Sequence, residues 1–351
     1  MKHIVKVFAG LLVLLACKKS TPTATSVVTQ EEVVTSLATN VNVVAYQQLA
    51  TSSDALYNSV LAFCVNPTDQ KLEECRQLWK ETRAVWEKTE GFLYGPVAND
   101  NVDPRIDTWP VDYLVLDSVL KSSIVFNEIN MSTLEDALKG FHPMEYLLFG
   151  KNGTKKASEL TAREKEYLTA LSLNVKNLTS QLAASWDVNK SDNYFTYFTN
   201  PSAANPYYKT TLDIYLAIVK GMIDICDEVA NGKIGVPFLA KDPTLEESPF
   251  SGNSLADFTN NLLSVQYVFQ GKFLSDHIGL VDFVKNNNLS LSQSINTKIN
   301  TAILALSNVK GPFSEAIIHQ PIQVQNAIEA INDLKGELEG KLIPYIQLYV
   351  K

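Results

Sequence analysis

The sequence predicts an all-α protein built from two helical bundles in tandem. The first observation is that apolar residues recur mainly at steps of three and four, as on one face of an amphipathic helix. The second is that clear alternation of apolar and polar residues, which is typical of strands, is missing. The third is that stretches containing Pro and Gly separate the periodic segments. The chain has 351 residues, 46% of them hydrophobic, which is enough for two packed cores.

Three segments show the helical period most clearly: Leu72 to Trp86, Leu160 to Leu182, and Val324 to Leu342. We also expect helices over residues 31–64, 110–125, 131–150, 207–232, 254–272 and 290–308. Three stretches, 94–110, 200–208 and 234–252, are predicted to be loops too long for simple helix connections. The segment 187–207 is the best candidate boundary, which places one bundle in 31–190 and the other in 191–351.

The first residues predict an exported protein held at a membrane. Residues 1–16 combine Lys2 and Lys6 with a short apolar run and read as a signal peptide. The "LLAC" that ends at Cys17 looks like a bacterial lipobox, whose cysteine becomes lipidated, and residues 17–30 would form a flexible tether. We therefore expect a cell-envelope protein, anchored through Cys17 at the periplasmic face or the outer membrane surface. The alternative is an ordinary secretory signal with a chance cysteine.

Charge argues against a nucleic-acid partner. Loss of residues 1–16 changes the formal net charge from −8 to −10, and an acidic surface repels phosphate backbones. The remaining cysteines, Cys64, Cys75 and Cys226, show no C-x-x-C spacing. Cys64 and Cys75 would either form a disulfide in an oxidising compartment or remain thiols.

"GFHPMEYLLFG", residues 140 to 150, carries the most specific pattern. Residues i and i+3 share a helix face, so His142 and Glu145 could present an imidazole and a carboxylate to one point. Gly140 and Pro143 predict a break, with one helix ending near Gly140 and another starting with Pro143 as its first residue. The alternative is that His142 caps this helix and Glu145 complements its positive end.

Three blocks together resemble the imelysin family of secreted and lipid-anchored bacterial proteins. They are the G-x-H-x-x-E motif above, "LWKETRAVWEKTEGFLYGP" (78–96) with "DPRIDTWPVD" (103–112), and "EESPFSGNSLADFTNN" (246–261). The resemblance implies two helical bundle domains, with the H-x-x-E segment at a site near the cleft between them. Members of this family have been classed as metallopeptidases and also linked to iron uptake.

The matching blocks supply the candidate site residues. We assign His142, Glu145 and Asp107 as candidate metal ligands. Arg83, Glu90, Ser251 and Asp257 are candidate residues for binding a ligand, with Arg83 able to orient a carboxylate bidentately.

Simpler roles are expected for several charged or polar side chains. Glu87 is expected on a solvated helix face, paired with Arg83. Asp107 and Asp112 are candidate helix N-caps, and Ser254 with Asp257 has capping-box-like spacing.

The leading functional hypothesis is an envelope lipoprotein that binds a metal ion or a small iron-bearing ligand, linked to iron uptake and acting beside a possible envelope transport partner. One imidazole among carboxylates favours iron, with zinc or calcium still open. The first alternative is a metal-dependent peptidase, although H-E-x-x-H is missing from the sequence. The second is a peptide- or glycan-binding module in which H-x-x-E is structural.

Overall fold

The protein is all-α, as the sequence predicts. The computed structural model describes residues 27–190 and 193–351, and every named element in these ranges is a helix. An isolated bridge between Lys272 and Asp276 is the only β-type pairing among them. None of the helices in this described part is long and apolar enough to span a membrane. The predicted signal peptide, Cys17 and the tether up to residue 26 lie outside the described residues.

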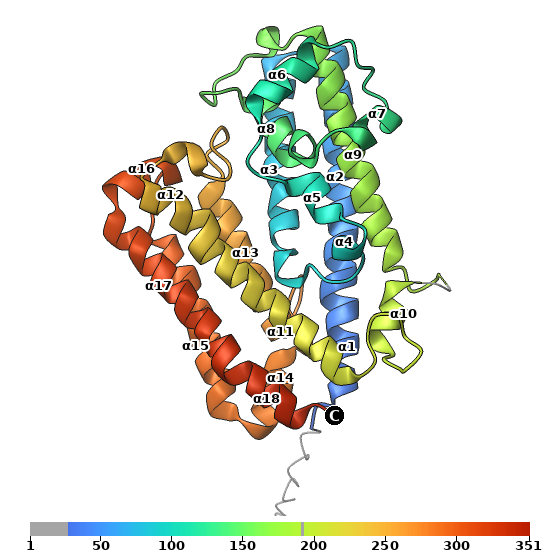
Figure 1. The fold of residues 1–351 in the computed structure, drawn as a ribbon, viewed down its shortest axis with the longest axis vertical. Coiled ribbons are helices and arrows are strands. Elements are labelled where there is room, and N and C mark those ends of the chain that lie inside the picture. Colours follow the sequence, from blue (N-terminus) through green and yellow to red (C-terminus); the bar gives the residue numbers. More distant parts are fainter. Residues whose placement is uncertain (1–26, 191–192) are drawn as a thin grey trace, which may run out of the picture.

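Three long helices form the frame of the first half of the chain (Figure 1). They are α2 (Val44–Val65), α3 (Asp69–Glu87) and α9 (Ala162–Ser185), and α2 packs against both of the others. The helix α1 (Gln30–Leu37) continues through the π-helical segment η1 (Ala38–Val43) into α2, which confirms the expected helix over 31–64. Short elements complete this half: α4 (Pro96–Asn99), α5 (Val102–Asp107), α6 (Tyr113–Lys121), α7 (Glu128–Thr133), η3 (Asp136–Leu138), α8 (Phe141–Phe149), η4 (Ala157–Glu159) and α10 (Tyr194–Thr199), the last of which packs against α1 and η1.

The second half is a layered group of helices (Figure 1). Its long members are α11 (Thr211–Asp227), α13 (Ser254–Gln270), α15 (Leu289–Ser307) and α17 (Pro321–Glu337). α15 packs against α13 and α17, and α11 packs against the same two helices. The remaining elements are η5 (Glu228–Ile234), α12 (Gly235–Ala240), η6 (Pro243–Leu245), α14 (Leu280–Asn287), α16 (Phe313–His319), η7 (Leu338–Leu342) and α18 (Ile343–Tyr349).

The two halves meet along α3. This helix packs against α13, and the 3-10 segment η2 (Glu90–Phe92) that follows it packs against α11 and α13. The approach is close, because a Cβ on Gly221 would lie 2.6 Å from the carbonyl oxygen of Gly91. The predicted division at 190/191 stays a prediction, since residues 191 and 192 are outside the described ranges and α1 contacts elements of the second half.

Several helix starts follow directly from capping chemistry. Thr29 and Glu32 form a capping box at α1, and Thr161 and Glu164 form one at α9. Asp112 caps α6 by accepting from the backbone of Leu114 and Val115, as the sequence predicted. These caps satisfy backbone N–H groups that have no partner inside the helix.

Three local predictions are wrong. The expected helix over 131–150 is three separate elements, α7, η3 and α8, because Gly140 takes a φ of +81° directly before α8. That helix starts at Phe141, so Pro143 lies in its first turn but is not its first residue. The expected loops 94–110 and 234–252 contain the short helices α4, α5 and α12.

Candidate functional site

A buried cluster of charged residues is centred on Arg83 of α3. Arg83 and Glu87 are one helical turn apart, and both side chains are fully buried, with Nη2 of Arg83 2.6 Å from Oε1 of Glu87. The expectation that Glu87 lies on a solvated face is therefore wrong. The helical period identified the pair correctly, but the face opposite Trp79 and Trp86 is covered by residues that are distant in the sequence.

Arg83 binds carboxylates from both halves of the chain. Its Nη1 pairs with Asp107 at the end of α5, and its Nη2 lies 2.8 Å from Oε1 of Glu247, after η6. Its Nε lies 3.8 Å from Asp257 of α13. Burial alone would lower the pKa of Arg83, but these carboxylates raise it well above its usual value. Arg83 thus stays charged and ties α3, α5 and the 246–257 region together.

Lys233 is a second, largely buried cation that the sequence analysis missed. Its Nζ lies 2.8 Å from Glu90, 2.9 Å from Glu247 and 3.6 Å from Glu87. Asn261 joins this network by donating to both Glu87 and Glu90. Lys233 lies on the π-helical segment η5, outside all three family-like blocks, so no sequence pattern marked it.

Carboxylates outnumber cations in this cluster. Two buried cations, Arg83 and Lys233, face five almost fully buried carboxylates: Glu87, Glu90, Asp107, Glu247 and Asp257. Burial raises the pKa values of Glu90, Glu247 and Asp257. The cluster therefore favours additional positive charge, either protons or a bound cation.

His142 lies beside this cluster because of Gly140. A Cβ on Gly140 would lie 2.0 Å from the carbonyl oxygen of Ile106, so only glycine lets the end of α5 approach the start of α8. The approach puts Nε2 of His142 3.1 Å from Oδ1 of Asp107, while the His142 ring packs against Trp109 with ring centroids 5.0 Å apart. Asp107 is not the helix N-cap that we expected; it ends α5 and binds side chains.

The electrostatics leave His142 neutral and Asp107 ionised. Burial and the nearby Arg83 lower the pKa of His142. Burial would raise the pKa of Asp107, but Arg83 and His142 lower it below its usual value. Both ring nitrogens of His142 are buried without a properly aligned hydrogen bond. A neutral imidazole with a free lone pair is the form that binds metals.

Glu145 is held apart from this group by a loop of the second half. Its Oε1 accepts from the backbone of Phe250 (3.1 Å) and Ser251 (2.7 Å) and from Oγ of Ser251 (2.6 Å). Its Oε2 is buried without a hydrogen bond, and burial raises the pKa of Glu145 to about 7. Ser251 thus binds Glu145 directly. A ligand role for either residue stays a prediction.

Asp257 has structural partners in the buried cluster. It accepts from Oγ of Ser248 at 2.6 Å and from the side chain of Asn253 at 2.7 Å. Ser254 is not the N-cap of α13; that position is Asn253, and Oγ of Ser254 instead donates to Glu246. The capping-box expectation is wrong because Ser254 is recruited by the preceding loop.

Two groups of side chains have ligand atoms close enough to hold one metal ion. Asp107, His142 and Glu247 form one group, and Glu87, Glu90 and Asp107 form the other, with ligand atoms within 4.8 Å of one another in each. The structure therefore groups His142 with Asp107 and Glu247, and Glu145 belongs to neither group. Glu247 lies in the third family-like block, where an acidic pair before Ser-Pro was its only signal.

A cleft between the two halves reaches this cluster. Its volume is about 470 Å³, and Glu90, Asp107, Lys233 and Glu247 line it together with apolar residues that include Trp109. One side comes from the end of α5 and the loop after it, and the other from η5, α12 and the loop after η6. Asp107 and Glu247 thus line a cleft whose volume exceeds that of a bare ion.

Relatives of this chain share its fold and much of its length. It is 28% identical over 313 residues to "Iron-regulated protein A" of Synechococcus elongatus, which covers 86% of this chain and 83% of that protein. A solved structure from Parabacteroides distasonis, described as an iron-regulated protein A precursor, matches with a TM-score of 0.81 and 23% identity over 90% of this chain and 94% of that one.

An imelysin-like protein from Psychrobacter arcticum matches with a TM-score of 0.73 and 13% identity, over 91% of this chain and 95% of that one. At these identities, the two structures establish the fold alone. The family model described as Imelysin matches residues 43–339, which is most of the chain. The chain belongs to the imelysin family.

Proposed function

We propose that the protein binds a metal ion, with iron favoured, through Asp107, His142 and Glu247. The observation that carries this proposal is a buried neutral imidazole next to two carboxylates: its Nδ1 has no partner, and its Nε2 has only the poorly aligned contact with Asp107 at 3.1 Å. Buried polar atoms in proteins are nearly always hydrogen-bonded, so such orphaned atoms call for a partner. Glu247 adds a second orphan, because its Oε2 is also buried without a hydrogen bond.

The residues fit a metal chemically. One imidazole with two carboxylates suits iron or manganese and is compatible with zinc, whereas calcium prefers oxygen ligands alone. A cation would also offset the excess of carboxylates around Arg83 and Lys233. The second group, Glu87, Glu90 and Asp107, shares Asp107 with the first and offers further oxygen ligands. The size of the cleft admits an ion carried by a small organic molecule.

The biological setting is part of the same proposal. The lipobox-like sequence that ends at Cys17 supports a lipid anchor in the cell envelope. The names of two relatives, which describe them as iron-regulated, support a link to iron. We infer that the protein captures iron, free or in a small complex, on the way to an envelope transport partner.

The geometry favours binding over peptide cleavage. Zinc peptidases need three ligands, an open position for water and a general base. Glu145, the acid of the H-x-x-E motif, is bound to the backbone of the 250–251 loop and is not part of the group around His142.

Elemental analysis of protein purified without a histidine tag is the first test, followed by calorimetric titration with Fe²⁺ under anaerobic conditions. We expect stoichiometric metal in the unaltered protein and loss of binding in His142→Ala and Glu247→Gln. His277→Ala is the matched control, because His277 is exposed and far along the chain from the cluster. Unchanged Fe²⁺ binding in both cluster variants, or no binding by the unaltered protein, would overturn the proposal.

A further inference from the structure

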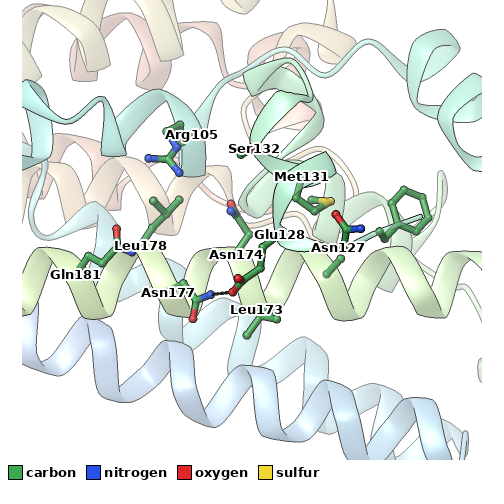
Figure 2. Close-up of a pocket in the computed structure, with 12 residues that line it drawn as sticks. Arg105, Asn127, Glu128, Met131, Ser132, Leu173, Asn174, Asn177, Leu178 and Gln181 are labelled. Carbon is green, nitrogen blue, oxygen red and sulfur yellow. Dashed lines mark hydrogen bonds between the residues drawn. The ribbon is translucent and has the colours of Figure 1, made fainter. Parts of the chain in front are cut away.

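A separate pocket lies on the first half of the chain, between α5, α7 and α9 (Figure 2). Its volume is about 240 Å³, below the roughly 300 to 1,000 Å³ typical of sites for drug-sized ligands. The residues that line it, such as Met131, Leu173 and Asn174, include none of the residues that line the cleft at Asp107. Its size suits a ligand smaller than a typical drug molecule.

One side of the pocket carries an arginine without a partner. Arg105 of α5 is half-buried and makes no hydrogen bond or ion pair within the described residues. The other arginines of the described residues are Arg76, Arg83 and Arg163, and each of them forms an ion pair with a carboxylate. A guanidinium that is partly removed from water and left unpaired is suited to bind a carboxylate bidentately.

The helix α9 supplies the complementary groups. Oδ1 of Asn174 is buried and accepts no hydrogen bond. Glu128, at the start of α7, is exposed; it accepts from Asn177 at 2.8 Å and forms no ion pair within the described residues. Figure 2 shows Asn174 and the hydrogen-bonded Asn177–Glu128 pair beside α9, with Arg105 and Met131 above them in this view. An unfilled acceptor beside a carboxylate calls for a cationic donor.

We propose that this pocket binds a free α-amino acid. The ligand's carboxylate pairs with Arg105, and its ammonium group donates to Glu128 and to Oδ1 of Asn174. An apolar ligand side chain packs on Met131 and Leu178, which are both buried. A zwitterion is the ligand class that complements an unpaired guanidinium, a carboxylate without an ion pair and an unfilled amide acceptor at once.

The test is a thermal-shift screen of the purified chain against the twenty L-amino acids, followed by calorimetry on the best. We expect at least one amino acid to bind. Its N-acetyl derivative and its methyl ester should each bind about tenfold more weakly or worse, because each lacks one charged end. A screen without binding, or equal affinity for the blocked derivatives, would overturn the proposal.

Variants test the residues separately. Arg105→Gln and Asn174→Leu should each weaken binding by about tenfold or more. Lys272→Gln is the control, because Lys272 is a half-exposed lysine paired with Asp276 in the other half of the chain. Circular dichroism melts show whether each variant is folded. If a variant is unfolded, the affinity of the unaltered protein for the N-acetyl and methyl ester derivatives tests the proposal instead. Folded variants that bind as tightly as the unaltered protein would contradict the assignment.

Discussion

Arg83 and Glu87 form an ion pair one helical turn apart, and neither side chain is exposed to solvent. Arg83 also binds Asp107 and Glu247, so three segments share one guanidinium. Removing one partner of a buried ion pair costs more than the pair contributes, because the other charge stays buried without compensation. A substitution at Arg83 should therefore change both the stability of the fold and the arrangement of the candidate site.

Arg83→Met should destabilise the protein by about 3 to 5 kcal/mol at pH 7. The loss should shrink as pH falls, because Asp107 and Glu247, no longer facing the guanidinium, can then take up protons. Urea unfolding at pH 5 and pH 7 measures both effects. Arg76→Met is the control on the same helix. Arg76 binds the backbone carbonyl groups of Leu148 and Lys155, which do not titrate, and its ion pair with the exposed Glu73 is screened by solvent. The loss of about 1 to 3 kcal/mol expected for this variant should therefore vary little with pH. Equal pH dependence in the two variants would contradict the buried cluster.

Asp103→Asn should stabilise the protein at alkaline pH. Burial, and then Asp107, raise the pKa of Asp103 to about 7. The folded state thus keeps a proton that the unfolded state loses near pH 4, and the free energy of unfolding falls as pH rises from there to about 7. Asparagine carries no charge and removes this penalty. The free energy of unfolding should therefore increase by on the order of 1 kcal/mol or more at pH 8, and by much less at pH 5. Urea unfolding of chelator-treated protein measures it. Asp333→Asn, at an exposed position, should leave the difference between the two pH values unchanged.

Gly140→Ala should be strongly destabilising. Gly140 has a φ of +81°, and a Cβ there would collide with the backbone of Ile106. We expect a loss of about 3 kcal/mol or more, measured by chemical unfolding. Gly252→Ala is the matched control, since Gly252 also has a positive φ but has open space around it, and it should cost about 1 to 2 kcal/mol. Similar losses at both positions would show that the contact with Ile106 is not the constraint.

Ser251→Ala should cost about 1 to 2 kcal/mol, because it removes one of three donors to Oε1 of Glu145. The hydrogen bond from Ser251 lowers the pKa of Glu145, so its loss matters most when Glu145 is ionised. The destabilisation should therefore be larger at pH 9 than at pH 6 in thermal or urea unfolding. Ser275→Ala, which removes only a contact with the exposed His277, should be close to neutral at both pH values. A pH-independent loss would argue against an ionised Glu145.

Iron affinity should fall between pH 7.5 and pH 5.5. Burial raises the pKa of Glu247, and a carboxylate must lose its proton to bind a metal. His142 contributes less to this effect, because its pKa is lowered and it stays neutral over the range. Anaerobic Fe²⁺ titrations at the two pH values measure the change. Affinity that is independent of pH would mean that Glu247 is not a ligand, whatever the role of His142.

The long helices were predictable because each buries one apolar face along its length, and that face produces the helical period in the sequence. The period from Leu160 to Leu182 gave α9 nearly to its ends, and the run over 31–64 gave α1 and α2. The short helices α4, α5 and α12 were missed because elements of four to six residues are too short for the period to show. Tertiary contacts, such as that of Gly140 with Ile106, decide their ends.

The candidate site was only partly readable from the sequence. The family-like blocks singled out His142 and Asp107, but helical spacing joined His142 to Glu145, whereas the fold groups His142 with Asp107 and with Glu247 from the other half. Helical spacing reports which residues share a face, and it cannot report which distant loop covers that face. Glu87 was assigned to solvent for the same reason.

The proposed ligands come from segments far apart in the chain, with Asp107 and His142 on α5 and α8 and Glu247 beyond η6. A fragment that lacks either half holds no more than two of the three. If these residues hold an ion as proposed, sliding one half past the other along α3 would separate Glu247 from Asp107 and His142 while every helix stays folded.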